Sequence, residues 1–444
     1  MLFGAAAARS REHEAVVPER GAVHPCADPT LRSVTDPVEI SSATARRFIL
    51  GRQGLWPGRR WKGKRGTRAA MIASEHVQLD PLVIVARSHD LMLHARVAGY
   101  RPEIFHELAY GERRFFDWGG WLAVRSMEEL PFWRVLMRRD RDNPRMTQVA
   151  DAVGPTIVEM RAALRERGTL SNRDFAAADR RAISTYRGNK DSSLALYYLW
   201  RVGEAMTHHR VGFERVYALT EAVAPEHLLA AAGEIDVERF MLRKQLAFMG
   251  IGRFALLSKV LHRKVSAAEA RAIGAQLAEA NEITPVAVDG WPGRSFVLTD
   301  DLPLLDAIDR GRVPRGWAPI GTTTDDEVAF LSPLDPVVDR DRARAVFGFD
   351  YVWEIYKRPD LVRYGRFAMP ILWGDRLAGR VDLRTDRRAR TLVVNGIWLE
   401  NDADARSKGF RDALRAGLRR LTAFVDVDRL DVTAVADARL RRTL

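Results

Sequence analysis

Two stretches of this chain repeat one order of predicted elements, and this order constrains the fold more than any other feature. In residues 143–224 and again in residues 225–311, segments with apolar residues at helical spacing precede a hairpin-like segment. The hairpin patterns lie at residues 210–219 and 283–298, and the second has a Gly- and Pro-containing tip. Helices closed by a β-hairpin are typical of a winged helix, and residues 37–142 show a looser version of the same order.

The pattern changes from about residue 312. Strand-like segments separated by turn residues are predicted at residues 353–356, 367–373, 377–383 and 391–399. A helix at 404–424 and a short last strand follow, which indicates a small antiparallel sheet or barrel.

The predicted fold class is therefore α+β, with three tandem winged-helix units followed by a small C-terminal antiparallel β-barrel-like domain. The predicted boundaries are residues 37–142, 143–224, 225–311 and 312–444. Residues 1–36 are rich in Ala, Arg, Glu and Pro without periodicity, and we interpret them as a disordered N-terminal extension, with an over-long gene start as the alternative.

The charge balance favours a polyanionic partner. The formal net charge is +12, which favours nucleic acid first and an anionic membrane surface second, with compositional drift toward Arg as the alternative. No apolar run is long enough to span a membrane. The single cysteine, Cys26, excludes an internal disulfide and a cysteine-held iron–sulfur cluster, so we expect a reducing, cytoplasmic location.

The familiar catalytic signatures are missing from the sequence. It contains no Walker-type nucleotide loop, no zinc-ligand spacing of Cys and His and no Gly-x-Ser-x-Gly motif. We therefore expect neither a cofactor nor a metal.

The most informative segment is Gln78-Leu79-Asp80-Pro81. In an extended chain Gln78 and Asp80 share one face, opposite Leu79. An amide beside a carboxylate can hold a water molecule, which the carboxylate orients or deprotonates. The alternative is that Asp80 caps a helix with Pro81 at its first position.

A wider set of motifs resembles one family. The pieces are Gln78-Leu79-Asp80 with Val85-Ala86-Arg87-Ser88-His89, Gly212-Phe213-Glu214-Arg215-Val216-Tyr217, Leu331-Ser332-Pro333-Leu334-Asp335-Pro336, Phe347-Gly348-Phe349-Asp350-Tyr351 with Glu354-Ile355-Tyr356, and Pro370-Ile371-Leu372-Trp373-Gly374-Asp375-Arg376-Leu377 with Gly379-Arg380-Val381-Asp382. In this order they resemble the YcaQ-type, AlkZ-like winged-helix DNA glycosylases. The resemblance implies three winged helices and a β-domain around a DNA groove.

The resemblance also implies a catalytic Gln-apolar-Asp motif, here Gln78 and Asp80, as in the branch that acts on varied alkyl adducts and crosslinks. The sequence departs from the family in the extra residues 1–36. It departs again at Phe116-Asp117-Trp118-Gly119-Gly120-Trp121, where an aromatic-Trp-Gly-His-Glu-like run is expected. This second departure bears on the edge of the pocket and the substrate range.

The predicted function is a monofunctional DNA glycosylase of base excision repair that removes N7-alkylated purines and unhooks interstrand crosslinks. Such a base carries a positive charge and leaves readily, so the protein needs to stabilise an oxocarbenium-like sugar and position a water. One alternative is a non-catalytic winged-helix regulator, and another is a hydrolase that acts on RNA or nucleotides. We expect a monomer, associated with the nucleoid, whose partner is double-stranded DNA bearing alkyl adducts or crosslinks.

Several basic and aromatic residues are candidates for DNA contact. They are Arg59, Arg60, Lys62, Lys64 and Arg65 in a basic, Gly-rich segment, Arg87, Ser88 and His89 beside the motif, Arg187, Lys190 and Arg210, and Trp291 with Arg294 at a hairpin tip. The alternative for the basic segment is a flexible solvated loop. For the residues beside the motif it is an ion pair of Arg87 with Asp90 and hydrogen bonds of His89 to nearby groups. For Arg187, Lys190 and Arg210 it is a position on the surface without contact to DNA. Trp291 is a minor-groove wedge or packs against its own domain.

Overall fold

The computed structural model describes residues 36–120, 122–175, 180–181, 189–253, 261 and 263–444. Residues 37–444 pack as one compact unit. The predicted extension, apart from Asp36, and the candidate Arg187 lie outside the described residues. No helix within the described ranges is long and apolar enough to cross a membrane.

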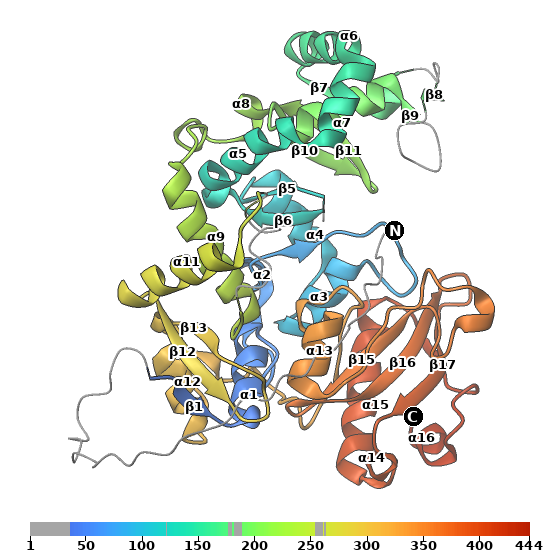
Figure 1. Cartoon of the computed structure of the whole chain (residues 1–444). Coiled ribbons are helices and arrows are strands. Elements are labelled where there is room, and N and C mark those ends of the chain that lie inside the picture. Colours follow the sequence, from blue (N-terminus) through green and yellow to red (C-terminus); the bar gives the residue numbers. More distant parts are fainter. Residues whose placement is uncertain (1–35, 121, 176–179, 182–188, 254–260, 262) are drawn as a thin grey trace, which may run out of the picture. The chain divides into compact units, whose positions relative to one another are not determined.

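The first predicted unit is mostly helical and contains a small sheet (Figure 1). Its elements are β1 (Val38–Ile40), α1 (Ser42–Arg52), β2 (Trp61–Lys62), α2 (Gly63–Ala73), β3 (Val77–Gln78), α3 (Ser88–Arg96), β4 (Val97–Ala98), α4 (Pro102–His106), β5 (Phe115–Trp118), β6 (Ala123–Ser126) and α5 (Leu130–Arg139). Strands β5 and β6 form an antiparallel hairpin, and β3 joins its edge in the order β3-β6-β5. The strand β3 is therefore held by a partner far along the chain.

The second predicted unit has a long helix, a shorter helix and a hairpin. Its elements are α6 (Pro144–Arg167), β7 (Thr169–Ser171), β8 (Arg180–Arg181), β9 (Asn189–Lys190), α7 (Asp191–Arg201), β10 (Ala205–Val211), β11 (Glu214–Leu219) and α8 (Thr220–Val223). The hairpin β10–β11 pairs with β7 in the order β10-β11-β7. Apolar residues of α6 and α7 pack with those of α5 in one core, which ties this unit to the first.

The third predicted unit contains α9 (Glu234–Met249), α11 (Ala267–Glu279), β12 (Ile283–Val288), β13 (Ser295–Leu298) and α12 (Leu302–Asp309). Strand β1 lies parallel beside β12, and Phe48 and Ile49 of α1 pack in the core with Val286 and Leu305. The first strand and helix of the ordered chain thus pack with this unit, although their place in the sequence puts them in the first. All three segments contain a hairpin joined by a third strand, and their assignment as winged helices stays a prediction.

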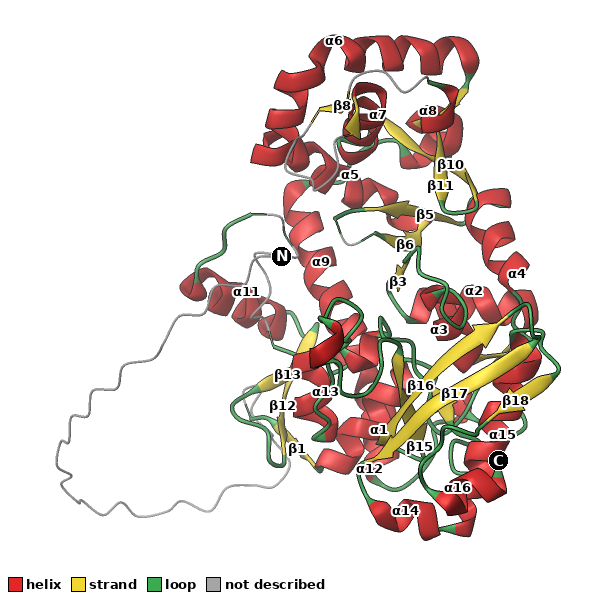
Figure 2. Ribbon diagram, turned by 90° about the vertical axis from the view of Figure 1, so that its right-hand side faces the viewer, coloured by secondary structure: helices red, strands yellow, loops and turns green. Residues whose placement is uncertain are grey.

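The C-terminal part is a curled five-stranded sheet covered by helices (Figure 2). Its elements are β14 (Ala329–Phe330), α13 (Arg340–Phe347), β15 (Ala368–Trp373), β16 (Arg376–Asp386), β17 (Thr391–Leu399), α14 (Asp402–Arg406), α15 (Lys408–Phe424), β18 (Arg429–Asp431) and α16 (Ala438–Thr443). Phe410, Leu414 and Leu418 of α15 are fully buried against the sheet. The mixed α and β composition confirms the predicted class.

Three details of this part differ from the sequence-based predictions. Strand β18 pairs in parallel with β17, because the chain crosses over through α15 between them. The predicted strand at 353–356 is irregular, since the buried Glu354 carboxylate accepts hydrogen bonds from the backbone N–H groups of Arg363 and Tyr364. The predicted helix at 404–424 is broken at Ser407, whose side chain caps α15 by accepting from the N–H of Phe410.

Candidate active site

The Gln78–Asp80 motif lies where β3 leaves its sheet. Val77 and Leu79 are 0% and 5% exposed and belong to one core, whereas Gln78 and Asp80 are half-buried. The N–H of Leu79 donates to the carbonyl of Leu122 at 2.8 Å, which continues the pairing with β6 by one residue. The alternation of an extended strand thus separates Val77 and Leu79 from Gln78 and Asp80.

Asp80 closes a tight turn. Its Oδ1 accepts a hydrogen bond from the N–H of Leu82 at 2.8 Å. No helix begins at Pro81, and the next helix, α3, starts at Ser88, so the helix-capping alternative does not describe this residue. Among the described residues, neither Oδ2 of Asp80 nor the amide of Gln78 has a hydrogen-bond partner, which leaves both groups available to a water or a substrate.

The loop after Asp80 is fixed by the C-terminal sheet. In β16 the backbone N–H of Thr385 donates to the carbonyl of Ile84 at 3.0 Å, and its Oγ1 donates to the carbonyl of Val85 at 3.0 Å. Val85 is fully buried in the core of that sheet. The candidate motif is therefore held on one side by β6 and on the other by β16.

Arg87 lies between this loop and the β10–β11 hairpin. Its Nη1 donates to the carbonyl of Pro81 at 3.3 Å, and its guanidinium lies 5.3 Å from the ring centre of Phe213 at the hairpin turn. Asp90 accepts a hydrogen bond from the Tyr100 hydroxyl at 2.6 Å. The half-buried Arg87 thus remains a candidate for contact with DNA near Asp80.

Ser88 and His89, which we expected at the DNA surface, are instead 2% and 3% exposed. The His89 ring packs against Phe105 with 4.6 Å between ring centres, and burial lowers its pKa to about 3. Burial raises the pKa of the neighbouring Asp90 to about 6. A neutral, enclosed imidazole cannot act as a cationic phosphate contact, so these two residues support the loop from inside.

Arg210 is also buried, which corrects its prediction as a DNA contact. Its side chain is 3% exposed and its Nη2 lies 2.8 Å from Oδ2 of Asp117. Tyr110 and Thr207 donate their hydroxyl hydrogens to the same carboxylate at 2.8 and 2.7 Å. Burial disfavours the charge of Asp117, but Arg210 and Arg215 hold the pKa of this carboxyl below its usual value.

Asp117 therefore anchors the hairpin to β5, a role that the sequence analysis did not identify. The one signal in the sequence is a lone carboxylate between Phe116 and Trp118 in an otherwise apolar strand. Such a carboxylate needs buried donors, but the sequence does not show that they come from residues 207 and 210.

Of the remaining basic residues proposed to contact DNA, some form contacts within the protein and others are exposed. Lys64 pairs with Glu107 and Glu112, Arg59 pairs with Glu327 at 2.6 Å, and Arg60 lies over the rings of Trp61 and Trp317. These contacts hold the basic segment against the protein, in place of the flexible loop considered as the alternative.

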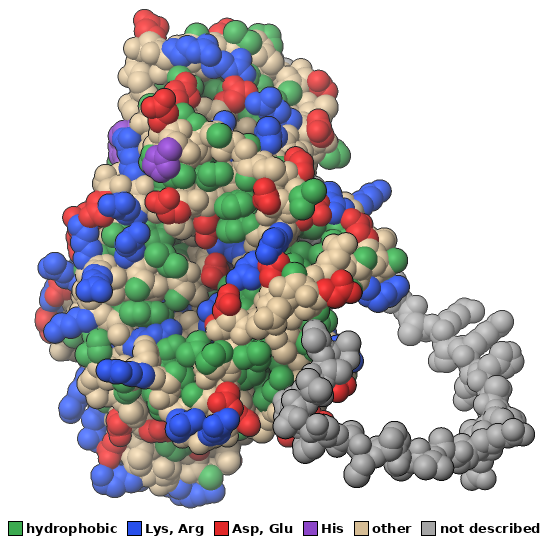
Figure 3. Space-filling view, turned by 90° about the vertical axis from the view of Figure 1, so that its left-hand side faces the viewer, with side chains coloured by type: hydrophobic (Ala, Val, Ile, Leu, Met, Phe, Trp, Pro, Cys, Tyr) green, Lys and Arg blue, Asp and Glu red, His purple; other side chains and the backbone are tan. Residues whose placement is uncertain are grey.

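Lys62, Arg65 and Arg294 are exposed. Lys190 donates to the carbonyl of Phe175 at 2.9 Å, and Trp291 packs partly buried against its own core. On the face drawn in Figure 3, Lys and Arg side chains alternate with Asp and Glu and form no continuous basic stripe.

The fold and the candidate site together define a mixed α and β protein that presents an amide–carboxylate pair at a half-buried strand end. The family model described as DNA glycosylase AlkZ-like matches residues 72–424, a range that includes both residues of the pair. The chain belongs to this family. Its structure is similar to that of the Streptomyces sahachiroi DNA glycosylase AlkZ, with 15% sequence identity and a TM-score of 0.54 over 90% of this chain and 99% of that one.

Proposed function

We propose that the protein is a monofunctional DNA glycosylase that hydrolyses the N-glycosidic bond of N7-alkylated purines and unhooks interstrand crosslinks. Membership of the AlkZ-like family supports a DNA repair glycosylase. The observation that carries the assignment of the site is the placement of Gln78 and Asp80 on the half-exposed side of one strand end, with free polar atoms.

The chemistry follows from the charge of the substrate. An N7-alkylpurine carries a positive charge, so the C1′–N9 bond breaks with its electron pair going to the base, and no acid is needed to protonate the leaving group. The sugar then becomes oxocarbenium-like, and an ionised carboxylate at Asp80 stabilises it.

Water completes the reaction at C1′. Gln78 can donate to and accept from one water molecule, which holds the oxygen in position. Asp80 accepts the proton that the water loses as its oxygen bonds to C1′. Residues 76–90 contain no lysine to form a Schiff base, in agreement with hydrolysis by water.

The exposure of the pair supports action on crosslinks. A base tied to the opposite strand cannot be flipped freely into a deep pocket, so its bond must be reached at an open surface. Asp80 and Gln78 are half-buried rather than enclosed. Lys62, Arg65 and Arg87 are the proposed phosphate contacts of a monomer that acts on double-stranded DNA in the nucleoid.

The direct test is incubation with a duplex oligonucleotide that bears a single N7-methylguanine, followed by alkali. We expect protein-dependent strand cleavage at that position alone, in the presence of EDTA, with the undamaged duplex and the same damaged duplex without protein as controls. A duplex with a single nitrogen-mustard crosslink should yield separated strands on a denaturing gel. Tight DNA binding without base release from either substrate would favour the non-catalytic regulator.

A further inference from the structure

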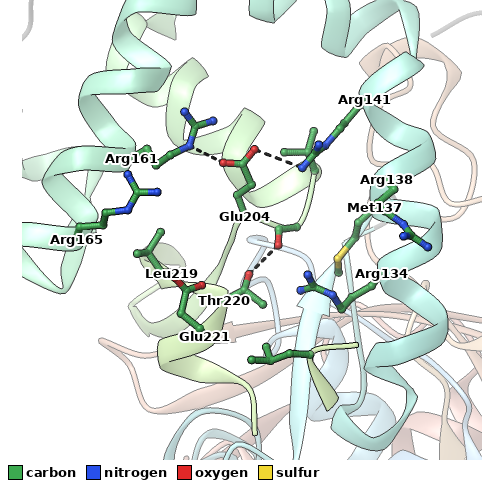
Figure 4. A pocket seen from close by; sticks show the side chains of 13 residues that line it. Arg134, Met137, Arg138, Arg141, Arg161, Arg165, Glu204, Leu219, Thr220 and Glu221 are labelled. Atoms are coloured by element: carbon green, nitrogen blue, oxygen red, sulfur yellow. Dashed lines mark hydrogen bonds and ion pairs between the residues drawn. The ribbon is translucent and has the colours of Figure 1, made fainter. Parts of the chain in front are cut away.

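An arginine-lined pocket lies at the base of the β10–β11 hairpin, the opposite end from Phe213. Helices α5 and α6 form its walls, and residues 202–204 and 219–221 form its floor (Figure 4). Its volume is about 330 Å³. This value lies at the small end of the range of about 300–1,000 Å³ that small-molecule sites occupy.

The charges of the pocket do not balance. The Glu204 carboxylate is shared by two guanidinium groups, with Nε of Arg161 at 2.6 Å and Nη2 of Arg141 at 3.5 Å. Arg134 and Arg165 point from α5 and α6 toward the space around Glu204. Five arginines line the pocket, Arg138 included, against two carboxylates even with Glu221 counted, which is an excess of three positive charges.

One nitrogen of these guanidinium groups lacks a hydrogen-bond acceptor among the described residues. Nη1 of Arg134 is buried and has no hydrogen-bond partner among the described residues. A buried donor without an acceptor is unfavourable, because it has lost its hydrogen bond to water and forms none within the protein. Burial, with Arg138 and Arg141 nearby, lowers the pKa of Arg134. An anion in the pocket would supply both the acceptor and the missing negative charge.

We propose that this pocket binds a phosphate group through Arg134 and Arg165. The planar guanidinium matches two phosphate oxygens at once, and the two side chains approach from opposite walls. The phosphate belongs either to a free phosphate compound or to the DNA backbone. The proposal does not depend on the glycosylase activity.

The position of the β10–β11 hairpin bears on the possibility that the bound phosphate belongs to the DNA backbone. Strand β11 runs from Glu214, beside Phe213, to Leu219 in the pocket floor. Six extended residues span roughly 20 Å. One base pair of duplex DNA rises 3.4 Å, so a length of roughly 20 Å corresponds to about six base pairs. A duplex with its damaged base near Asp80 would therefore place phosphates about six base pairs from that base close to the pocket.

The test compares Arg134→Gln and Arg165→Gln with Arg167→Gln, an exposed arginine of α6 outside the pocket. Inorganic pyrophosphate is titrated into each full-length protein by calorimetry, and circular dichroism checks that each variant is folded. If the source is a free phosphate compound, we expect the two pocket variants to bind pyrophosphate at least 10-fold more weakly than the wild type. Arg167→Gln should bind like the wild type.

A second arm measures binding to an undamaged 20-base-pair duplex by fluorescence anisotropy over a range of KCl. A backbone phosphate in the pocket predicts that each pocket variant lowers the slope of log affinity against log salt by about 0.9. Equal behaviour of the pocket variants and Arg167→Gln in both arms would overturn the proposal. A protein that binds pyrophosphate through this pocket but releases no alkylated base would overturn the proposed function alone.

Discussion

At the scale of residues, we propose different roles for Gln78 and Asp80 because the two side chains differ in charge. In the proposed mechanism, Asp80 supplies a negative charge next to the developing sugar cation, while Gln78 supplies a neutral donor and acceptor for water. Both groups are half-buried, and Oδ1 of Asp80 is already engaged by the N–H of Leu82. We therefore propose that the second oxygen, Oδ2, is the one that acts in the reaction.

Replacing Gln78 by Ala tests the water-positioning part of this scheme. We expect Gln78→Ala to slow base release about 10- to 100-fold, because the water loses its orientation while the carboxylate charge remains. Single-turnover kinetics on the N7-methylguanine duplex measure the rate. Gln148→Ala, an exposed glutamine of α6, is the matched control. A Gln78→Ala rate equal to that of the wild type would remove this residue from the site.

At the scale of elements, the loop of residues 81–87 depends on β16 of the C-terminal sheet. Thr385 holds this loop twice, through its backbone N–H and through its hydroxyl. The backbone bond survives substitution, but the hydroxyl bond to the carbonyl of Val85 does not. We therefore propose that Thr385 positions Asp80.

Substituting Thr385 by Val removes this hydroxyl and nearly preserves the shape. We expect the rate of base release to fall about 10- to 100-fold, since small displacements of a catalytic group are costly, while DNA affinity stays unchanged. Thr385→Ser should restore the rate. Thr422→Val is the matched control, because Thr422 makes the same kind of bond within α15. If Thr385→Val and Thr422→Val release base equally fast, β16 does not position the motif.

The sequence predicted those elements whose signals are local. The helix–hairpin order and the shared face of Gln78 and Asp80 follow from spacing and turn residues. Contacts between distant segments have no such signal. Arg210 was predicted as a DNA contact because it is basic and flanks the predicted helices. Its position in the sequence does not show that it binds the buried Asp117.

The same limit applies to β1, whose partner β12 lies far along the chain. Two short apolar strands can pair in many ways, and only the completed core with Phe48 and Val286 selects one. The family resemblance supplied the Gln78–Asp80 assignment, which spacing alone could not distinguish from a helix cap.

At the scale of the whole molecule, buried charged and ionisable groups join the segments. Arg96 of α3 and Asp335 form an ion pair in which both side chains are 0% exposed, with bonds of 2.6 and 2.9 Å. His94 of the same helix stacks on Phe424 of α15 with 4.2 Å between ring centres. Because burial lowers the pKa of His94, the stability of the unit depends on the protonation of this ring.

The buried histidines predict that the protein loses stability in mild acid. Burial lowers the folded-state pKa of His89 to about 3 and that of His94 well below 6.5. The unfolded chain binds these protons below about pH 6.5, so stability falls as the pH drops through that value toward the folded pKa. Asp90, whose pKa rises to about 6, acts in the opposite direction and offsets part of the loss.

The His89→Gln variant isolates one of these contributions. Urea unfolding at pH 7 and pH 5 should show that the wild type loses about 2 kcal/mol more than the variant between the two values. His227→Gln, which changes an exposed histidine, should lose as much as the wild type. If His89→Gln and the wild type lost equal stability between pH 7 and pH 5, His89 would take up its proton in the folded protein as it does in the unfolded chain.

The measurement that tests the central claim most directly is single-turnover release of N7-methylguanine by the Asp80→Asn variant. Asn is nearly isosteric but carries no charge and accepts no proton, so we predict a rate about 10²- to 10⁴-fold below that of the wild type. Affinity for the same duplex should stay equal or increase, because a carboxylate that repels phosphate is gone. An Asp80→Asn variant that releases the base at the wild-type rate would contradict the assignment of Asp80 as the catalytic carboxylate.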